Sequence, residues 1–296
     1  IWGKYSMANE KRKWGDRRDA RMVRDNDPLH FFVPYLYPHR ADNEAVVTEQ
    51  IDLTAMNAFL AEKNAGRTED RYTLMHAIVA ALVRTITLRP KMNRFIQGNR
   101  LYQRDDLTTG FVVKKQFADN GAEALAFLKW GPETTIDTVH EKVMAEIHEC
   151  RSDKLDNSTA GMEKFTHLPR WMMRIAIRIL FILDYYGRAP YSLVKKDPNY
   201  STVFISNLGS IKLNANYHHL CNWGTTSIFL VIGKKHLAPI YDEKGNMEMH
   251  EVVDLSITLD ERIADGYYYS KSVQILKHLL QHPEMLNERA DCEVKL

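Results

Sequence analysis

The chain lacks several features that would place it in a specialised class. Its three cysteines, Cys150, Cys221 and Cys292, lie far apart with no CxxC pair, and an odd count favours reduced thiols over a disulfide framework. The net charge is only +2, and no basic patch interleaved with aromatic residues is present, which argues against nucleic acid as a partner. We therefore expect a cytoplasmic protein that binds no nucleic acid.

Signals for secretion and for membrane crossing are also missing. Residues 1–6 have neither a positive n-region nor an apolar h-region, so we expect no signal peptide, and Met7 is a candidate natural start. Residues 171–186 form the most apolar predicted helix, with 16 residues. At 1.5 Å per residue this helix is about 24 Å long, short of the roughly 30 Å hydrocarbon core. We expect no transmembrane span.

The composition is that of a globular protein, with 45% apolar and 26% charged residues. Residues 10–27 mix Arg, Lys and Asp, which predicts an exposed arm or a charged first helix, so we divide the chain into an arm, 1–27, and one domain, 28–296. Residues 30–38 are aromatic but contain Pro34 and Pro38, which argues against a regular helix. We expect this stretch to pack against a neighbouring surface.

Strand and helix signals mix along the rest of the chain. The clearest helix is 73–89, where Leu74, Ile78, Leu82 and Ile86 recur every four residues. Other helices are predicted at 54–65, with Thr54 as N-cap, and at 136–151, 171–186 and 270–280. Strands are predicted at 45–52, on both sides of a turn at 104–106, and at 124–130, 200–206, 225–232 and 251–259. Without a strict βαβ rhythm, an α/β sandwich with a mixed sheet fits best.

Two segments carry a specific pattern. Tyr200–Ile211 reads YSTVFISNLGSI, and Leu259–Gly266 reads LDERIADG. They resemble the phenylalanine-x-isoleucine-serine-asparagine-leucine-glycine stretch and the His-Arg-x-x-Asp-Gly signature of the dihydrolipoamide acyltransferase catalytic domains of 2-oxo acid dehydrogenases. Weaker likenesses lie at 91–95 and 279–286. No lipoyl domain is recognisable before them, so we expect the catalytic-type domain to stand alone.

The resemblance implies a fold, a substrate and an assembly. The family shares its fold with chloramphenicol acetyltransferase, which implies an α/β two-layer sandwich with a large mixed sheet. The expected substrate is coenzyme A or an acyl-CoA, that is, an acyl thioester, and no metal is expected. The resemblance also implies a homo-oligomer, a trimer or an assembly of trimers.

The catalytic histidine of that signature is replaced by Glu261. In the family, a neutral imidazole removes the proton from the attacking thiol or hydroxyl, and the serine that matches Ser206 donates a hydrogen bond to the oxyanion, usually from a neighbouring subunit. A carboxylate of pKa about 4.3 is roughly four units too weak a base for a thiol of about 8.5. A negative charge there would also oppose the oxyanion.

Three interpretations of Glu261 remain open. The chemistry has been lost and the protein is a scaffold or binding protein, or burial raises the pKa of the carboxylate into a useful range, or another residue is the base. For the last, His218 and His219 are the candidates, because they lie in the loop between the Ser206 segment and the strand that begins near Gly224. The sequence therefore leaves two hypotheses open. The protein catalyses CoA-dependent acyl transfer to an unknown acceptor, or it is a non-catalytic oligomer.

The other motif residues are expected to be structural. The resemblance implies that Asp265 pairs with an arginine, with Gly266 allowing a tight turn and Arg262 serving as a scaffold charge. Candidates for the partner arginine are Arg17, Arg18, Arg21 and Arg24. Asn207 and Gly209, in the segment that carries Ser206, are likewise expected to have structural roles.

A hydrophobic insertion near 161–199 separates this chain from the family. Its predicted helix carries Arg170, Arg174 and Arg178 four residues apart, which leaves an apolar surface around most of the circumference. Burial between subunits or under the aromatic 30–38 stretch, a lid over an acyl tunnel, and contact with a membrane surface would each cover this surface.

Overall fold

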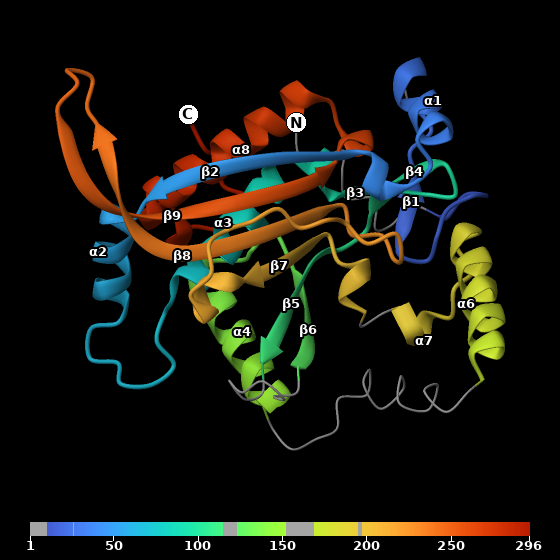
Figure 1. Cartoon of the computed structure of the whole chain (residues 1–296), viewed down its shortest axis with the longest axis horizontal. Helices are drawn as coiled ribbons and strands as arrows, with labels where there is room; N and C mark the ends of the chain where they lie inside the picture. The colour runs from blue at the N-terminus through green and yellow to red at the C-terminus, as the bar shows by residue number, and fades with distance from the viewer. Residues whose placement is uncertain (1–10, 26, 115–122, 152–168, 195–196) are drawn as a thin grey trace.

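The computed structural model describes residues 11–25, 27–114, 123–151, 169–194 and 197–296, so Met7 and the first part of the insertion, 161–168, lie outside the described residues. A six-stranded sheet in the order β2-β9-β8-β7-β5-β6 forms its centre (Figure 1). The strands are β2 (Glu44–Asp52), β5 (Leu107–Lys114), β6 (Glu123–Trp130), β7 (Val203–Asn207), β8 (Ile228–Tyr241) and β9 (Met247–Asp260). β7 is parallel to β5 and β8, and the other pairs are antiparallel, so the predicted mixed sheet is confirmed.

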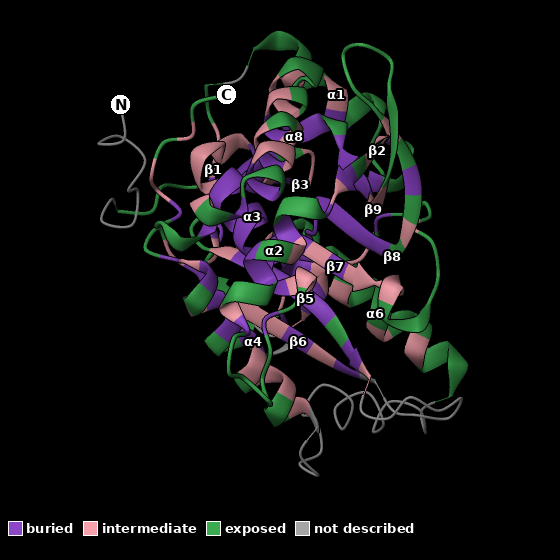
Figure 2. Ribbon diagram, turned by 90° about the vertical axis from the view of Figure 1, so that its left-hand side faces the viewer, coloured by how far each residue is buried: buried purple, intermediate pink, exposed green. Residues whose placement is uncertain are grey.

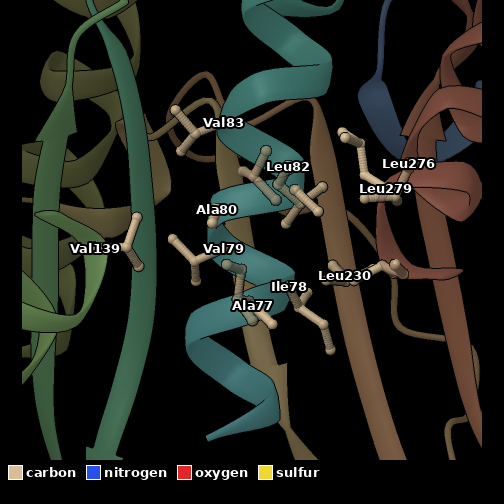
Figure 3. Close-up of a cluster of buried hydrophobic side chains, with 14 of the residues drawn as sticks. Ala77, Ile78, Val79, Ala80, Leu82, Val83, Val139, Leu230, Leu276 and Leu279 are labelled. Carbon is tan, nitrogen blue, oxygen red and sulfur yellow. The ribbon is translucent and has the colours of Figure 1, made fainter. Parts of the chain in front are cut away.

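Helices cover one face of this sheet. The central one is α3 (Leu74–Leu88), which packs beside α4 (Ile136–Arg151) and α8 (Gly266–Gln281), with α2 (Thr54–Lys63) nearby. Figure 2 shows α3 as one of the most buried elements. In Figure 3 the side chains of α3 point toward Val139 of α4, Leu230 of β8 and Leu276 of α8. Burying each large aliphatic side chain stabilises the fold by about 1.5 to 3 kcal/mol, which makes this layer the main core.

A small second sheet contains part of the charged N-terminal segment. Its strands are β1 (Ala20–Met22), β3 (Arg94–Gln97) and β4 (Arg100–Arg104), in the order β1-β4-β3. The expected exposed arm or charged helix at 10–27 is therefore wrong. Arg17 and Arg21 are buried, because Arg17 pairs with Asp19 and Asp184 and Arg21 pairs with Asp105. Composition cannot reveal such pairing, because two of the partner carboxylates, Asp105 and Asp184, come from distant segments.

The aromatic stretch also differs from its prediction, because Pro28–Leu36 forms the helix α1. The Asp27 carboxylate accepts hydrogen bonds from Leu29 N and His30 N, and Pro28 lies in the first turn, where its missing N–H is not needed. Pro34 removes one helical hydrogen bond, and the short helix tolerates that loss.

Apart from β3, the short helix Tyr191–Val194 and the short 3-10 turns, which the sequence did not predict, the remaining elements agree with the sequence within a few residues, although β8 and β9 are longer than predicted. Thr54 is the first residue of α2 rather than its cap, and the Asp52 carboxylate accepts from Thr54 N. The other helices are α6 (Arg170–Tyr185) and α7 (Tyr191–Val194). Short 3-10 turns are η3 (Arg40–Asp42), η4 (Pro90–Asn93), η5 (Pro198–Tyr200), η6 (Leu208–Ile211), η7 (Glu261–Ile263) and η8 (Pro283–Asn287). In the described ranges, every helix is too short or too polar to cross a bilayer.

Candidate active site

Ser206 lies on the face of the sheet that the helices leave open. Side chains alternate along β7, so Val203 and Ile205 belong to the helix-side core, whereas Phe204 and Ser206 point to the other face. This face is covered by residues 212–224, which we call the covering loop. Its Leu220 is buried in a small apolar cluster with Phe229 and Val231 of β8. Ser206 is partly buried at the edge of that cluster.

Two neighbours of Ser206 shape the end of β7. The Asn207 side chain accepts a hydrogen bond from Ser210 N at 3.2 Å and closes the turn η6. A Cβ on Gly209 would lie only 2.5 Å from the backbone oxygen of Gly233, so only glycine allows η6 to pack this closely on β8. Both residues are therefore structural parts of the segment that presents Ser206.

The covering loop places an imidazole on the same face. The ring of His218 stacks on Phe229, with centroids 3.9 Å apart and planes 6° apart, and Phe229 stacks on Phe204 at 5.0 Å. Phe204 precedes Ser206 by two residues, and Phe229 lies on the adjacent strand. Two residues along β7, one strand spacing and the 3.9 Å stack on Phe229 together put His218 on the order of 11 Å from Ser206. The second imidazole, His219, stacks on His218 with centroids 5.0 Å apart.

Backbone contacts decide which ring nitrogens are free. His218 Nδ1 lies 2.9 Å from the His219 oxygen, and His219 Nδ1 lies 3.2 Å from the Leu220 oxygen. A carbonyl oxygen can only accept, so in both rings Nδ1 is the donor, and the neutral form has its lone pair on Nε2. Both side chains are exposed. Each imidazole can therefore take a proton at Nε2 from a group that approaches the covering loop from solvent.

Glu261 lies far from Ser206 within one protomer. It follows β9 in the turn η7, its side chain is exposed, and its backbone N donates to Asn43 O at 2.9 Å. Ser206 pairs with Val231, and Val231 pairs with Ser256, five residues before Glu261. Five residues and two strand spacings separate the two positions by about 17 Å along the strands and about 10 Å across them. They can meet in one site only if different protomers supply them.

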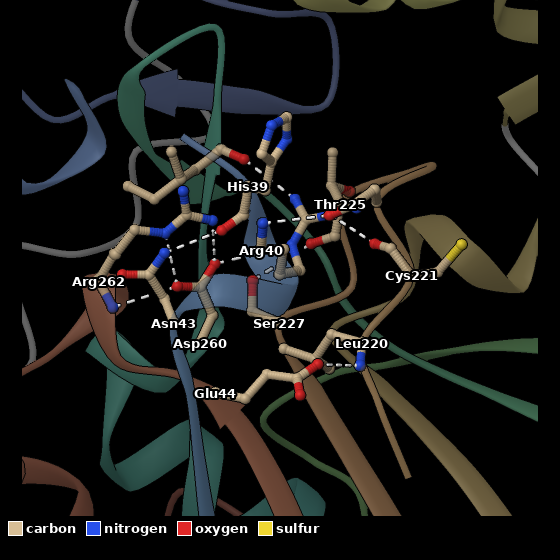
Figure 4. Close-up of polar contacts among 12 residues, drawn as sticks. His39, Arg40, Asn43, Glu44, Leu220, Cys221, Thr225, Ser227, Asp260 and Arg262 are labelled. Carbon is tan, nitrogen blue, oxygen red and sulfur yellow. Dashed lines mark hydrogen bonds and ion pairs between the residues drawn. The ribbon is translucent and has the colours of Figure 1, made fainter. Parts of the chain in front are cut away.

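A buried ion-pair network holds the backbone around Glu261 (Figure 4). Arg262 contacts Asp260 through Nε–Oδ1 at 2.8 Å and Nη2–Oδ2 at 2.7 Å, and its Nη1 donates to Tyr37 O at 2.9 Å. Arg40 reaches the same carboxylate at 3.7 Å. Burial lowers the pKa of Arg40, and the negative charge of Asp260 opposes that shift. The motif arginine is therefore a scaffold charge.

The same network also holds the covering loop in place. Arg40 Nη1 donates to Cys221 O at 2.8 Å and to Gly224 O at 3.2 Å. Glu44, at the start of β2, accepts from Leu220 N and from the Tyr217 hydroxyl. Figure 4 shows the contacts of Arg40 and Glu44 with the covering loop beside Asp260 at the end of β9. The position of His218 is thus linked to the segment that carries Glu261.

Two expectations about the motif are wrong. Asp265 does not pair with an arginine from the N-terminal segment in the part of the chain that the structure describes, because its carboxylate caps α8 and accepts from Tyr268 N at 2.8 Å. The side chains of Arg17, Arg21 and Arg24 pair with other aspartates. Gly266 is the first residue of α8 and has no positive φ, so no tight turn requires it. The buried aspartate is Asp260, directly before Glu261.

A cavity of about 510 Å³ opens beside Asn207, the residue that follows Ser206. This volume suits a small-molecule ligand. Asn207, Lys235, Asn57, Tyr72 and Met75 are among its lining residues. Lys235 Nζ contacts Asn57 at 2.9 Å and Glu251 at 3.1 Å. Over the described ranges, no group of His, Cys, Asp and Glu is arranged to hold a metal ion.

Arg40, Glu44 and Asp260 were not identified from the sequence. Arg40 and the covering loop are about 180 residues apart in the chain, and no local pattern marks such a contact. Asp260 was inside the motif segment, but its burial could not be seen there. Its position at the buried end of a strand was the only available signal.

Known proteins share this fold. Residues 190–287 match the family model for the 2-oxoacid dehydrogenases acyltransferase catalytic domain, and that segment includes Ser206 and Glu261. No curated protein matches the sequence.

Three solved structures are similar over nearly the whole chain. Azotobacter vinelandii dihydrolipoamide acetyltransferase has a TM-score of 0.59 at 15% identity, covering 89% of this chain and 94% of its own. The cubic core of the pyruvate dehydrogenase multienzyme complex has a TM-score of 0.55 at 14% identity, covering 90% of this chain and 94% of its own. Chloramphenicol acetyltransferase has a TM-score of 0.53 at 14% identity, covering 88% of this chain and 99% of its own. The chain therefore has the chloramphenicol acetyltransferase-like fold, a two-layer α/β sandwich with a large mixed sheet.

Proposed function

We propose that this protein transfers acyl groups from a coenzyme A thioester to a hydroxyl or thiol acceptor, with Ser206 as oxyanion donor and His218 as base. His218 Nε2 takes the proton of the acceptor, which attacks the thioester carbonyl. The Ser206 hydroxyl donates a hydrogen bond to the oxyanion. Collapse expels the CoA thiolate, which recovers the proton from the imidazolium.

The observation that carries this proposal is the placement of His218 on the sheet face of Ser206, with no hydrogen-bond partner for its Nε2 among the residues that the structure describes. A separation on the order of 11 Å leaves room for the reacting carbonyl and the attacking acceptor between the hydroxyl and the imidazole. His219 offers the same tautomer at the next position and is the alternative base. Glu261 is a weaker candidate, since a carboxylate is a weaker base than an imidazole and Glu261 lies beyond the end of β9, far from Ser206 in the same protomer.

We also propose a homo-oligomer, a trimer or an assembly of trimers. The structural neighbours include the cubic core of the pyruvate dehydrogenase multienzyme complex, which supports assembly here. In such an oligomer, Glu261 of a neighbouring protomer is the residue expected to approach Ser206. The cavity beside Asn207 is the proposed entry for part of the thioester.

Thiol release from acetyl-CoA and longer acyl-CoAs, followed with a thiol-reactive dye, tests the proposal. With hydroxyl and thiol acceptors, we expect turnover by the wild type, a 10² to 10⁴-fold lower rate for His218→Asn, and about 10² to 10³-fold for Ser206→Ala. His282→Asn, which changes an exposed histidine far along the chain, is the matched control. If His218→Asn keeps the wild-type rate while His219→Asn loses it, the base is His219.

A non-catalytic scaffold is the second candidate, because Glu261 stands where the family has its histidine. It predicts a wild type without turnover on any acyl-CoA and a Glu261→His variant that gains turnover. A wild type whose turnover depends on Ser206 and His218 would rule this candidate out.

A further inference from the structure

The helix α6 carries an exposed apolar ridge. Trp171, Ile175, Ile179 and Ile182 are 64%, 50%, 51% and 57% exposed. They recur every three or four residues, so they form one stripe along the helix. Figure 1 shows α6 at the edge of the molecule, away from the large sheet. A ridge of this kind is a surface for a further contact.

A basic stripe runs beside the ridge. Arg170, Arg174 and Arg178 are exposed and follow one another at four-residue intervals. Residues 170–183 contain no Asp or Glu, and the one acidic residue of α6, Asp184, is buried, so the exposed surface of this helix is positive. The outward side of α6 therefore has an arginine sector next to an apolar sector.

The C-terminal end of α6 fixes this orientation. Arg17 donates from Nη1 to Asp184 O at 3.0 Å and from Nη2 to Asp184 Oδ1 at 3.2 Å, while Gln97 donates to Asp184 Oδ2 at 2.7 Å. Phe181 contacts Trp223 of the covering loop, with ring centroids 5.4 Å apart. The helix is thus held at one end, and the ridge and the arginines face outward over most of its length.

We propose that α6 docks the protein on the surface of an anionic bilayer. The helix would lie parallel to the surface, with the ridge among the upper acyl chains and the arginines on lipid phosphates. Adjacent apolar and cationic sectors with an aromatic residue near the helix end are the pattern of interfacial helices. The exposed aromatic residues of α1, at the same edge in Figure 1, extend the contact.

The charge pattern favours lipid over a second copy of this chain. A twofold contact places the same patch of both protomers face to face. Two α6 helices in that arrangement would bring arginines against arginines with no acidic residue between them, which costs binding energy. Anionic phosphates provide the complementary charge, and acyl chains provide the apolar environment for Trp171 and its neighbours.

The experiment is co-sedimentation of the full chain with vesicles of phosphatidylcholine alone or with one quarter phosphatidylglycerol. We expect binding to the mixed vesicles that weakens as salt is raised. Ile175→Ser/Ile179→Ser and Arg174→Glu/Arg178→Glu should each lower the partition coefficient at least tenfold. The control is Leu237→Ser/Met249→Ser on the β8–β9 hairpin, where both residues are apolar and at least as exposed as Ile175 and Ile179, and it should stay within twofold.

Light scattering without lipid completes the test, and circular dichroism verifies that each variant is folded. An unchanged mass for the α6 variants together with lost vesicle binding supports the proposal. The proposal is overturned if the wild type does not sediment with the mixed vesicles, if the control loses binding equally, or if the α6 variants dissociate to a smaller species, which would mean that another protomer covers the ridge. Vesicle binding does not require acyl transfer, so failure of one leaves the other standing.

Discussion

Arg262 binds both carboxylate oxygens of Asp260, at 2.8 Å and 2.7 Å, and their side chains are 1% and 0% exposed. Glu261 lies between them in the sequence, with its own side chain exposed. The backbone of residue 261 is therefore held by its neighbours rather than by its own side chain. Substitution of Glu261 should leave the fold intact and change only the chemical group that is exposed at this position.

Breaking this ion pair should destabilise the fold strongly. Asp260→Asn leaves Arg262 and Arg40 without their shared carboxylate in a buried site, so the free energy of unfolding should fall by about 3 to 5 kcal/mol. Urea unfolding measures it. The control is Lys129→Ala, which removes an ion pair with Asp106 whose side chains are both 56% exposed, and it should cost less than about 1 kcal/mol. Equal losses for the two variants would contradict the structural role of Asp260.

Gly224, which ends the covering loop, should not tolerate alanine. Its φ is +84°, and a Cβ would lie 2.2 Å from Asn199 O, an atom that accepts hydrogen bonds from Thr225 N and Thr226 N. Gly245 is the control, with φ +81° and open space around the added Cβ. Gly245→Ala should cost about 1 kcal/mol from the left-handed conformation alone. Gly224→Ala should cost at least about 2 kcal/mol more in thermal or urea unfolding, because backbone atoms must move.

His76 should make stability depend on pH. It is buried in α3, its Nδ1 accepts from Thr73 N at 2.9 Å, and burial, followed by the nearby charge of His140, lowers its pKa to about 4. The facing groups are His140, at 5.0 Å between ring centroids, and Tyr72. The unfolded chain binds a proton below about pH 6.5 while the folded protein does not. Stability should therefore fall as pH decreases from about 6.5 to 4, by up to about 3 kcal/mol.

His76→Gln isolates this effect. Glutamine at this position can accept the same backbone N–H in a capping box but does not titrate. Its free energy of unfolding should show a weaker slope between pH 6.5 and pH 4 than that of the wild type. A slope that is unchanged in the variant would assign the pH dependence to other groups.

Mixed oligomers should reveal which protomer supplies each catalytic group. Ser206 and His218 lie in the same protomer under the proposed function, so co-assembled Ser206→Ala and His218→Asn chains should not regain activity beyond the mean of the two. If the Glu261 carboxylate of a neighbour were the base instead, Ser206→Ala and Glu261→Gln chains would complement each other. Thiol-release rates of co-expressed, differently tagged pairs distinguish the two arrangements.

Local patterns predicted the elements whose cause is local. The four-residue apolar period of 74–86 predicted α3, and the likewise local signals of 136–151 predicted α4 with its full bounds. Prediction failed for α1 and β1. In α1 the capping contacts of Asp27 outweighed the cost of Pro34, and in β1 distant aspartates neutralised Arg17 and Arg21, so a charged segment became buried.

The sequence by itself determined the class of fold and the identity of the motif positions, since apolar periodicity and the Ser206 and Glu261 segments are readable in order along the chain. Only the tertiary structure decided which groups share a site. Strand register placed Ser206 and Glu261 far apart in one protomer, and stacking on Phe229 brought His218 to the face of Ser206. Such distances depend on pairing between segments remote in sequence, and no local interaction specifies them.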